Sequence, residues 1–139
     1  MLLLDLDDFK VVNDTYGHLM GDQLLMAVAR RLEVATRATD TICRFGGDEF
    51  LYLVDGVATR FEAEQVATRL LETLVEPFPV GEASVEQRAS IGIVVWDEAS
   101  SGYNEIIQEA DLALYEANRR GKGHHFVFPF AKKTETTHD

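Results

Sequence analysis

Residues 44–50 read Arg-Phe-Gly-Gly-Asp-Glu-Phe, and this stretch decides the expected fold. It lies between two β-prone apolar runs, 42–45 and 50–54. A Gly-Gly pair between such runs predicts a β-hairpin with a two-residue turn that requires positive φ. The turn would place Asp48 and Glu49 at the tip of a sheet, where a metal ion or a phosphate can approach. The alternative is an ordinary hairpin with solvated acids, since short motifs also occur by chance.

The composition is that of one globular domain with an acidic surface. The chain has 139 residues, 46% of them hydrophobic, and its 13 basic and 24 acidic residues give a net charge of −11. This length suits a single domain with a substantial core. The charge argues against binding to a nucleic-acid polymer, which depends on Lys and Arg neutralising phosphates. A small anionic ligand remains compatible, because a bound cation can invert the local field.

Other bulk features point to a cytoplasmic domain. No apolar run approaches the length of a membrane span, and Met1 leads into leucines without the basic start of a signal peptide. We expect no direct membrane contact by this domain, although its parent protein can be membrane-attached. The single cysteine, Cys43, falls in a predicted buried strand and is expected to be an inert core thiol. Because the chain opens inside a predicted buried strand, we expect a missing upstream segment.

The order of the predicted elements gives the fold class. Helical spacing and end signals predict helices at 9–16, 19–36, from Thr59 to before Pro77, and 103–120. Apolar runs predict strands at 2–6, 41–45, 49–54, 89–95 and 125–128. A hairpin inside an otherwise alternating pattern predicts an α+β fold, with a central antiparallel-containing sheet flanked by helices. The domain would span 1–128, and 129–139 would be a polar tail or linker.

Three short signals refine these elements. Thr59 followed by Glu62 predicts a capping box at the start of a helix. Gly92, inside a predicted strand, indicates a close approach of another backbone. Gly121 is expected just beyond the end of the last helix.

Two acids are candidates for a metal site. Asp5 ends the first predicted strand and Asp48 lies in the hairpin turn, and in a ferredoxin-like sheet these places are neighbours. With the carbonyl of Leu6, they would supply the hard oxygen ligands that suit Mg²⁺, completed by water and phosphates. The alternative is that the acids cap the following helix, and for Asp7 and Asp8 we favour that interpretation.

Basic and amide side chains are candidates for holding a nucleotide. Lys10 lies near the start of a predicted helix, where phosphates bind, and the last helix ends in Arg119, Arg120 and Lys122. A solvated lysine and favourable pairing with the helix dipole are the alternatives. Asn13 and Asp22 together offer the donor and acceptor groups that match a guanine edge, but both are also ordinary helix-end residues.

Together these residues resemble the GGDEF family of diguanylate cyclases. The similarity extends from residue 2 to about 128, and the matching motifs occur in the family's order at 5–10, 12–18, 21–22, 44–50, 90–92 and 110–115. The resemblance implies a nucleotidyl-cyclase or polymerase-palm type of sheet. It also implies condensation of two GTP molecules into cyclic di-GMP, with release of two pyrophosphates, by two facing domains of a homodimer.

The resemblance also assigns roles by analogy. Metals, Mg²⁺ or alternatively Mn²⁺, would be held by Asp5, Asp48 and the carbonyl of Leu6, and Glu49 would assist deprotonation of the attacking 3′-hydroxyl. Guanine would be bound by Asn13 and Asp22. Phosphates would contact Lys10, the backbone of Asp8 and Phe9, Arg119 and Lys122, and the glycines Gly46 and Gly47 would let the hairpin pass close to the nucleotide.

Residues 37–40 resemble the family's Arg-x-x-Asp inhibitory site. There Arg37 would bind guanine or phosphate of the product cyclic di-GMP through its planar fork, and Asp40 would accept from guanine N–H groups. Taken without the family, the two residues would read as a solvated helix end.

The match fails at the end of the last helix. Asn118 stands where the family usually has lysine, and Lys122 where it usually has arginine. Losing the bidentate fork and one charge weakens a phosphate site. Two hypotheses follow: an active diguanylate cyclase domain inhibited by its product, or a catalytically impaired GGDEF domain that binds GTP or cyclic di-GMP as a regulatory module. As isolated, even a competent domain could be monomeric and inactive.

Overall fold

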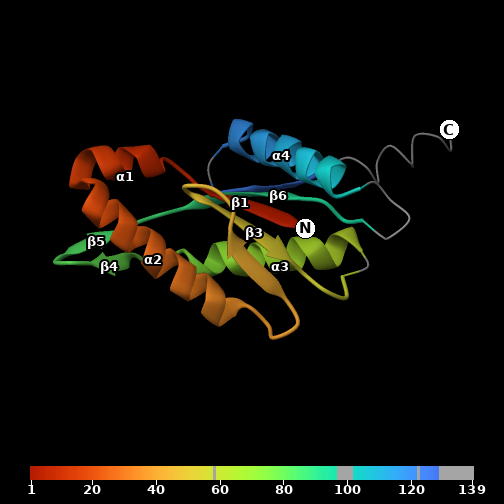
Figure 1. The fold of residues 1–139 in the computed structure, drawn as a ribbon, viewed down its shortest axis with the longest axis horizontal. Helices are drawn as coiled ribbons and strands as arrows, with labels where there is room; N and C mark the ends of the chain where they lie inside the picture. Colours follow the sequence, from red (N-terminus) through yellow and green to blue (C-terminus); the bar gives the residue numbers. More distant parts are fainter. Residues whose placement is uncertain (58, 97–101, 122, 129–139) are drawn as a thin grey trace, which may run out of the picture.

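The computed structural model describes residues 1–57, 59–96, 102–121 and 123–128, which form one α+β unit (Figure 1). The helices are α1 (Phe9–Tyr16), α2 (His18–Ala35), α3 (Arg60–Thr73) and α4 (Tyr103–Arg119). The strands are β1 (Leu2–Leu6), β2 (Thr41–Arg44), β3 (Glu49–Leu53), β4 (Phe78–Val80), β5 (Ala83–Val85), β6 (Ala89–Ile93) and β7 (His125–Val127). The expected fold class is confirmed.

A five-stranded sheet in the order β2-β3-β1-β6-β7 forms the centre of the molecule. Its pairings are antiparallel except for β6 with β7, which is parallel. β1 is the middle strand, and Leu4 lies opposite Phe50 on one side and Ile91 on the other. Its almost continuous apolar sequence fits this place, because both faces of the strand are covered.

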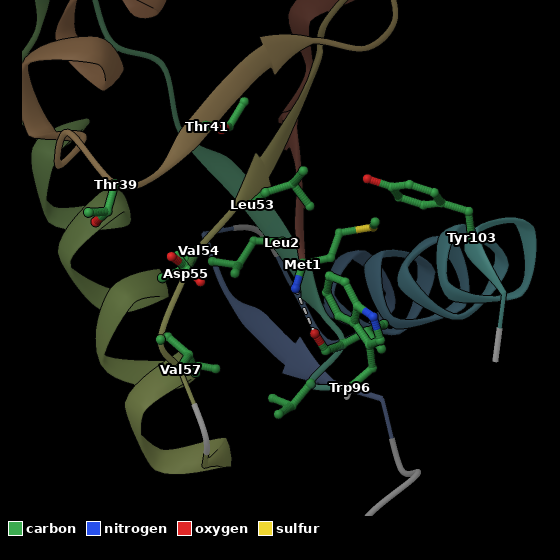
Figure 2. A pocket seen from close by; sticks show the side chains of 14 residues that line it. Met1, Leu2, Thr39, Thr41, Leu53, Val54, Asp55, Val57, Trp96 and Tyr103 are labelled. Atoms are coloured by element: carbon green, nitrogen blue, oxygen red, sulfur yellow. Dashed lines mark hydrogen bonds between the residues drawn. The ribbon is translucent and has the colours of Figure 1, made fainter. Parts of the chain in front are cut away.

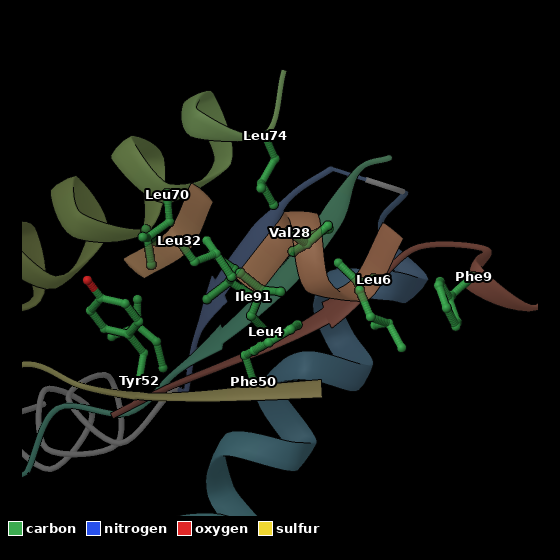
Figure 3. Close-up of a cluster of buried hydrophobic side chains, with 14 of the residues drawn as sticks. Leu4, Leu6, Phe9, Val28, Leu32, Phe50, Tyr52, Leu70, Leu74 and Ile91 are labelled. Carbon is green, nitrogen blue, oxygen red and sulfur yellow. The ribbon is translucent and has the colours of Figure 1, made fainter. Parts of the chain in front are cut away.

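Helices cover both faces of the sheet, so the core has two parts. On one face, α2 and α3 pack against alternate β1 residues, Leu2, Leu4 and Leu6, in a buried cluster shown in part in Figure 3. On the other face, α4 packs against Met1 and Leu3. The period of two along β1 therefore divides its side chains between the two layers.

The local end signals are confirmed. Thr59 and Glu62 form a capping box at the start of α3. Gly17, between α1 and α2, has φ of 90°, and Gly121, after α4, has φ of 122°. A Cβ at Gly92 would overlap the carbonyl oxygen of Ala110 and the amide nitrogen of Leu114, so this glycine lets α4 lie directly on the sheet.

Three expectations were wrong. Cys43 is exposed, because β2 is the edge strand of the sheet and only Ile42 among its residues is partly buried. The turn after β2 does not use positive φ at either of its described glycines, Gly46 and Gly47. It is longer than two residues: Phe45 still pairs with Glu49, donating its N–H to the Glu49 carbonyl over 2.8 Å, and three residues connect them.

A second, two-stranded sheet of β4 and β5 was not expected from the sequence. Its strands have three residues each, and Pro79 is the middle residue of the first. Arg31 of α2 holds this hairpin and the end of α3 in place. Its guanidinium donates to the carbonyl oxygen of Glu76 over 2.6 Å and lies 3.6 Å from the centre of the Phe78 ring.

Candidate active site

The strand register gathers acids at one end of the main sheet. Asp5, near the end of β1, lies directly opposite Glu49 at the start of β3, and the Leu6 amide donates to the Asp48 carbonyl over 3.1 Å. Asp5 and Glu49 share the sheet face covered by α4, since they alternate with residues that point to the other layer. We call this region, defined by Asp5, Asp7, Asp48 and Glu49, the acidic end. The predicted meeting of Asp5 with Asp48 is confirmed.

The carboxyl groups of Asp5 and Asp48 lie together and are joined by a side-chain hydrogen bond. Burial is the largest cause that raises the pKa of Asp5 to about 7; the charges of Asp48 and Glu49 and a side-chain hydrogen bond with Asp48 add to it. Two carboxylates in hydrogen-bond contact cannot both ionise without cost, so Asp5 takes up a proton more readily than an ordinary aspartate. The acidic end therefore brings together carboxylates whose negative charges repel one another.

A hard divalent cation fits this donor set. The Oδ1 atom of Asp5 is buried and has no hydrogen-bond partner among the described residues. Such an orphaned oxygen beside a second carboxylate suits Mg²⁺ or Mn²⁺. Within the described ranges, no group of three or more His, Cys, Asp or Glu side chains is arranged to bind a metal. The protein would thus supply two carboxylates, with the remaining positions left to the Leu6 carbonyl, water and ligand oxygens.

The loop between β2 and β3 is shaped around Glu49. A Cβ at Gly46 would lie 3.0 Å from Oε1 of Glu49, whereas a Cβ at Gly47 would meet no described atom within 4 Å beyond its neighbours. Burial, followed by the charges of Asp111 and Asp48, raises the pKa of Glu49. Arg44 fastens the loop by donating to the carbonyl oxygens of Gly46 and Gly47, over 3.2 and 2.8 Å.

The start of α1 follows the acidic end directly. Asp8 occupies the N-cap position with φ of 57°, a conformation that costs energy for a non-glycine residue. Asp8 therefore stands at the predicted helix start, but in the described structure its side chain makes no capping hydrogen bond. The predicted capping role of Asp7 was wrong, because its side chain bonds to Ser90 and Gly123 instead. Phe9 is buried, and Lys10 is exposed in the first turn.

The two residues predicted to bind guanine lie on facing helices. Asn13 of α1 is half-buried, and its Oδ1 occupies the space where a Cβ of Gly21 would be. Asp22, the next residue of α2, is exposed. Gly21 thus allows the close packing of α1 on α2, with Asn13 against Gly21, the residue before Asp22.

The basic end of α4 reaches the same end of the sheet. β7 runs parallel to β6, with His125 opposite Ile91, so the connection from α4 enters the sheet near Ser90 and Asp5. Arg119 donates to both carboxylate oxygens of Glu116, over 2.6 and 3.1 Å, and Asn118 is exposed. Lys122 lies outside the described residues.

The Arg37–Asp40 pair is placed apart from the acidic end, between α2 and β2. Nε of Arg37 lies 3.1 Å from Oδ2 of Asp40, whose side chain is fully buried and also accepts from the Asp55 amide over 3.4 Å. Arg37 remains about half exposed. A ligand of this site would thus meet the arginine first, and Asp40 only after the ion pair opens.

A cavity of about 450 Å³ lies at the opposite end of the sheet from the acidic end (Figure 2). It is lined by the start of β1, the end of β3 and the segment after β6, and its aromatic wall is formed by Trp96 and Tyr103. Asp55 is its one acidic lining residue among those described. The polar groups that could perform chemistry lie at the acidic end and not in this cavity.

The structure also shows contacts that the sequence did not reveal. Asp7 accepts hydrogen bonds from Ser90 and Gly123, which lie 83 and 116 residues further along the chain. Arg44 was recognised as part of a motif but not as the group that orders the loop. Long-range partners of this kind leave no local pattern, although the occurrence of Ser90 and Gly92 in one motif indicated that the segment matters.

Fold and site together define a class of α+β domain whose acidic side chains converge on one end of an antiparallel-containing sheet, beside a helix-borne cluster of polar groups. Among known families, the one described as diguanylate cyclase, GGDEF domain, matches residues 1–124. The chain belongs to the GGDEF family.

Individual relatives agree with this assignment. MucR of Pseudomonas aeruginosa, named a bifunctional diguanylate cyclase/cyclic di-GMP phosphodiesterase, is 38% identical over 92% of this chain and 18% of its own. PdeR of Escherichia coli, named a cyclic di-GMP phosphodiesterase, is 41% identical over 92% of this chain and 19% of its own. The crystal structure of the GGDEF domain of YfiN (TpbB) from Pseudomonas aeruginosa superposes with a TM-score of 0.87, at 30% identity, over 91% of this chain and 80% of that one.

The chain thus spans about a fifth of the two curated relatives. Within the described residues, no helix is both long and apolar enough to cross a membrane.

Proposed function

We propose that this chain binds GTP and condenses two GTP molecules into cyclic di-GMP and two pyrophosphates as a homodimer. In each of the two steps, the 3′-oxygen of one nucleotide forms a bond to the α-phosphorus of the other, and the bond to the β-phosphate bridging oxygen breaks. The 3′-hydroxyl proton is transferred to a base. The observation that carries the proposal is the partly buried, hydrogen-bonded pair Asp5–Asp48, with the pKa of Asp5 raised to about 7.

The residues of the acidic end divide this work. Asp5, Asp48 and the Leu6 carbonyl would hold Mg²⁺ or Mn²⁺, which when bound neutralises charge on the phosphates. Glu49 is the candidate base, since its raised pKa moves it toward the neutral range in which a base is effective. Asn13 and Asp22 would bind guanine from the facing helices, while Lys10, the first amides of α1, Arg119 and Lys122 would orient phosphates.

Product inhibition is part of the proposal. Arg37 is exposed enough to meet an incoming anion, and its ion pair with buried Asp40 would exchange for contacts with cyclic di-GMP. We expect Arg37→Ala to relieve inhibition by added cyclic di-GMP without lowering the initial rate of turnover. Inhibition unchanged in this variant would contradict the assignment.

The second candidate is a regulatory GGDEF module that binds GTP or cyclic di-GMP without turnover. Asn118 at a usual lysine position favours it. The 41% identity to PdeR, whose name gives only phosphodiesterase activity, also favours it.

The two candidates are separated by incubating the chain with GTP and Mg²⁺ and resolving the nucleotides by chromatography. Because each domain is expected to hold one GTP, the chain is assayed alone and joined to a parallel two-stranded coiled coil that forces dimerisation. Accumulation of cyclic di-GMP, abolished in Asp48→Ala and retained in Asp55→Ala, supports the enzyme. Tight GTP binding without product supports the module. Product formation by Asp48→Ala equal to the wild type would refute the metal site.

A further inference from the structure

Asp7 is the most connected polar residue of the acidic end. Its carboxylate accepts from the hydroxyl of Ser90 over 2.7 Å through Oδ1 and from the amide of Gly123 over 2.9 Å through Oδ2. Its backbone N–H donates to the Arg88 carbonyl over 2.8 Å, and its own carbonyl accepts from Nε2 of Gln87 over 2.7 Å. Each of these four contacts reaches a different position far from Asp7 in sequence.

The contacts join three elements at one point. Gln87 and Arg88 precede β6, Ser90 lies within it and is fully buried, and Gly123 lies between α4 and β7. The orientation of Gln87 is unambiguous, because its amide also donates to the Arg88 carbonyl and two carbonyls require the NH₂ group. The next residue after Gly123 continues the attachment, since the His124 carbonyl accepts from the Ile91 amide over 2.9 Å.

Both carboxylate oxygens of Asp7 are occupied by these donors. A charged acceptor makes stronger hydrogen bonds than a neutral one, and Ser90 is held in a buried environment where the bond is protected from water. Gly123 has φ of 76°, a conformation that suits glycine and that aims its amide at Asp7. Asp7 therefore lies beside the metal-ligand candidates but acts on the chain rather than on a ligand.

We propose that Asp7 is a positioning residue: it fixes the basic end of α4, Arg119 and Arg120, relative to the Asp5–Asp48 pair, so that a bound nucleotide meets both at once. This inference rests on the proposed function, because it takes the bound nucleotide to be GTP. Arg120 also packs over the Phe126 ring at 4.6 Å, which anchors the other side of the same connection. The segment is thus held by Asp7, just after β1, and by Phe126 of β7.

The test compares Asp7→Ala with Asp7→Asn. An asparagine can still accept from the Gly123 amide through its carbonyl oxygen while its NH₂ group donates to the Ser90 hydroxyl, so it keeps the geometry and removes the charge. We expect the dissociation constant for a non-hydrolysable GTP analogue, at saturating Mg²⁺, to rise about tenfold in Asp7→Ala, because the hydrogen bond that holds Gly123 and the connection after α4 is lost. In Asp7→Asn it should stay within about threefold of the wild type.

Hydrogen exchange of the Gly123 amide, followed by NMR, tests directly whether Asp7 holds the connection between α4 and β7. Its protection should be lost in Asp7→Ala and kept in Asp7→Asn, while Asp55→Ala, an exposed aspartate at the other end of the sheet, changes neither exchange nor affinity. Ser90→Ala, which keeps the Gly123 contact, serves as the second variant if Asp7→Ala does not fold, and its affinity should fall less than tenfold.

The outcomes are distinct. Equal affinity of wild type and Asp7→Ala would overturn the positioning role and leave the proposed function intact. Equal losses in Asp7→Asn and Asp7→Ala would overturn it as well, because the charge would then matter rather than the geometry. Absence of GTP-analogue binding by the wild type would overturn both the proposed function and the role of Asp7 toward GTP. Retained protection of the Gly123 amide in Asp7→Ala would show that the attachment does not depend on Asp7.

Discussion

At the scale of single residues, the acidic end combines strained and repelling groups that a stable fold would otherwise avoid. Asp5 is hydrogen-bonded to Asp48 and has its pKa raised to about 7, and Glu49 lies opposite Asp5. Asp8, directly after this region, adopts φ of 57°. Concentrated like charges and backbone strain at one site are typical of positions kept for a ligand rather than for stability. Each of these features therefore predicts a measurable gain in stability when it is removed.

Replacing Asp5 by asparagine should stabilise the fold at alkaline pH. The pKa of Asp5 is about 7 in the folded chain and 3.8 ordinarily, so the folded state binds the proton more tightly. Its contribution to stability is therefore fully present at low pH and is lost as pH rises toward 8. Allowing for solvent screening of a half-exposed group, we expect Asp5→Asn to exceed the wild type by about 1 kcal/mol at pH 8, roughly 4 °C in Tm, and by little at pH 4.

Differential scanning fluorimetry over this pH range, with and without Mg²⁺, measures the effect. The matched control is Asp55→Asn, at an exposed position. The difference in Tm between this variant and the wild type should not change with pH. Mg²⁺ should raise the Tm of the wild type but not of Asp5→Asn. A Tm difference independent of pH would contradict the assigned proton.

The two loop glycines should respond differently to alanine. A Cβ at Gly46 would press on the Glu49 carboxylate at 3.0 Å, while a Cβ at Gly47 has open space. Because the end of a flexible side chain can move, Gly46→Ala should cost at most about 1 kcal/mol of stability but should displace Glu49 and lower turnover roughly tenfold. Thermal melts and product formation are compared, with Gly47→Ala as the control for stability. Full turnover by Gly46→Ala would argue against Glu49 as the base.

At the scale of elements, hydrophobic pattern was sufficient for the long segments and failed for the short ones. β1, α2 and α4 follow from spacing alone, and the meeting of Asp5 and Asp48 follows from a hairpin paired with a central strand. The β4–β5 hairpin was missed because three residues give no measurable period, although Gly81, with φ of 60°, marks its turn. Cys43 was misplaced because a strand sequence does not tell an edge from a centre. The Asp7 contacts could not be predicted, since they depend on tertiary register.

Gly92→Ala should separate α4 from the sheet. Its Cβ would overlap backbone atoms of Ala110 and Leu114, which cannot rotate away as a side chain does. Overpacking of this kind costs about 3 kcal/mol or more, so the Tm should fall by roughly 10 °C. Gly102→Ala, at a described glycine with open space around it, is the control. Equal melting temperatures for both variants would show that α4 does not rest on Gly92.

At the scale of the whole molecule, the sheet separates two ends with different chemistry. The acids and the basic end of α4 lie at one end of the sheet. The cavity lined by Trp96 lies at the other. A single acidic end offers one set of candidate ligands for one nucleotide, so joining two nucleotides calls for two copies of the chain. This separation leaves the cavity end free of the proposed chemistry.

The proposed activity should therefore depend on association. At low concentration, the rate of product formation per chain should rise in proportion to chain concentration, and the fused coiled coil should remove that dependence. A dilution series assayed for cyclic di-GMP measures it. Without the fusion, a rate per chain that stays constant over a hundredfold dilution would mean either that one domain suffices or that the dimer is very tight. Analytical sedimentation at the same concentrations distinguishes these two cases.

The central place of β1 also has a consequence for biosynthesis. This strand precedes both of its neighbours, pairing with β3 around Phe50 and with β6 around Ile91. On the ribosome its leucines emerge well before the second neighbour exists, and such distant pairings form slowly. Until β6 is translated, one edge of β1 therefore lacks its partner, and unpaired strand edges promote the aggregation that chaperones counter.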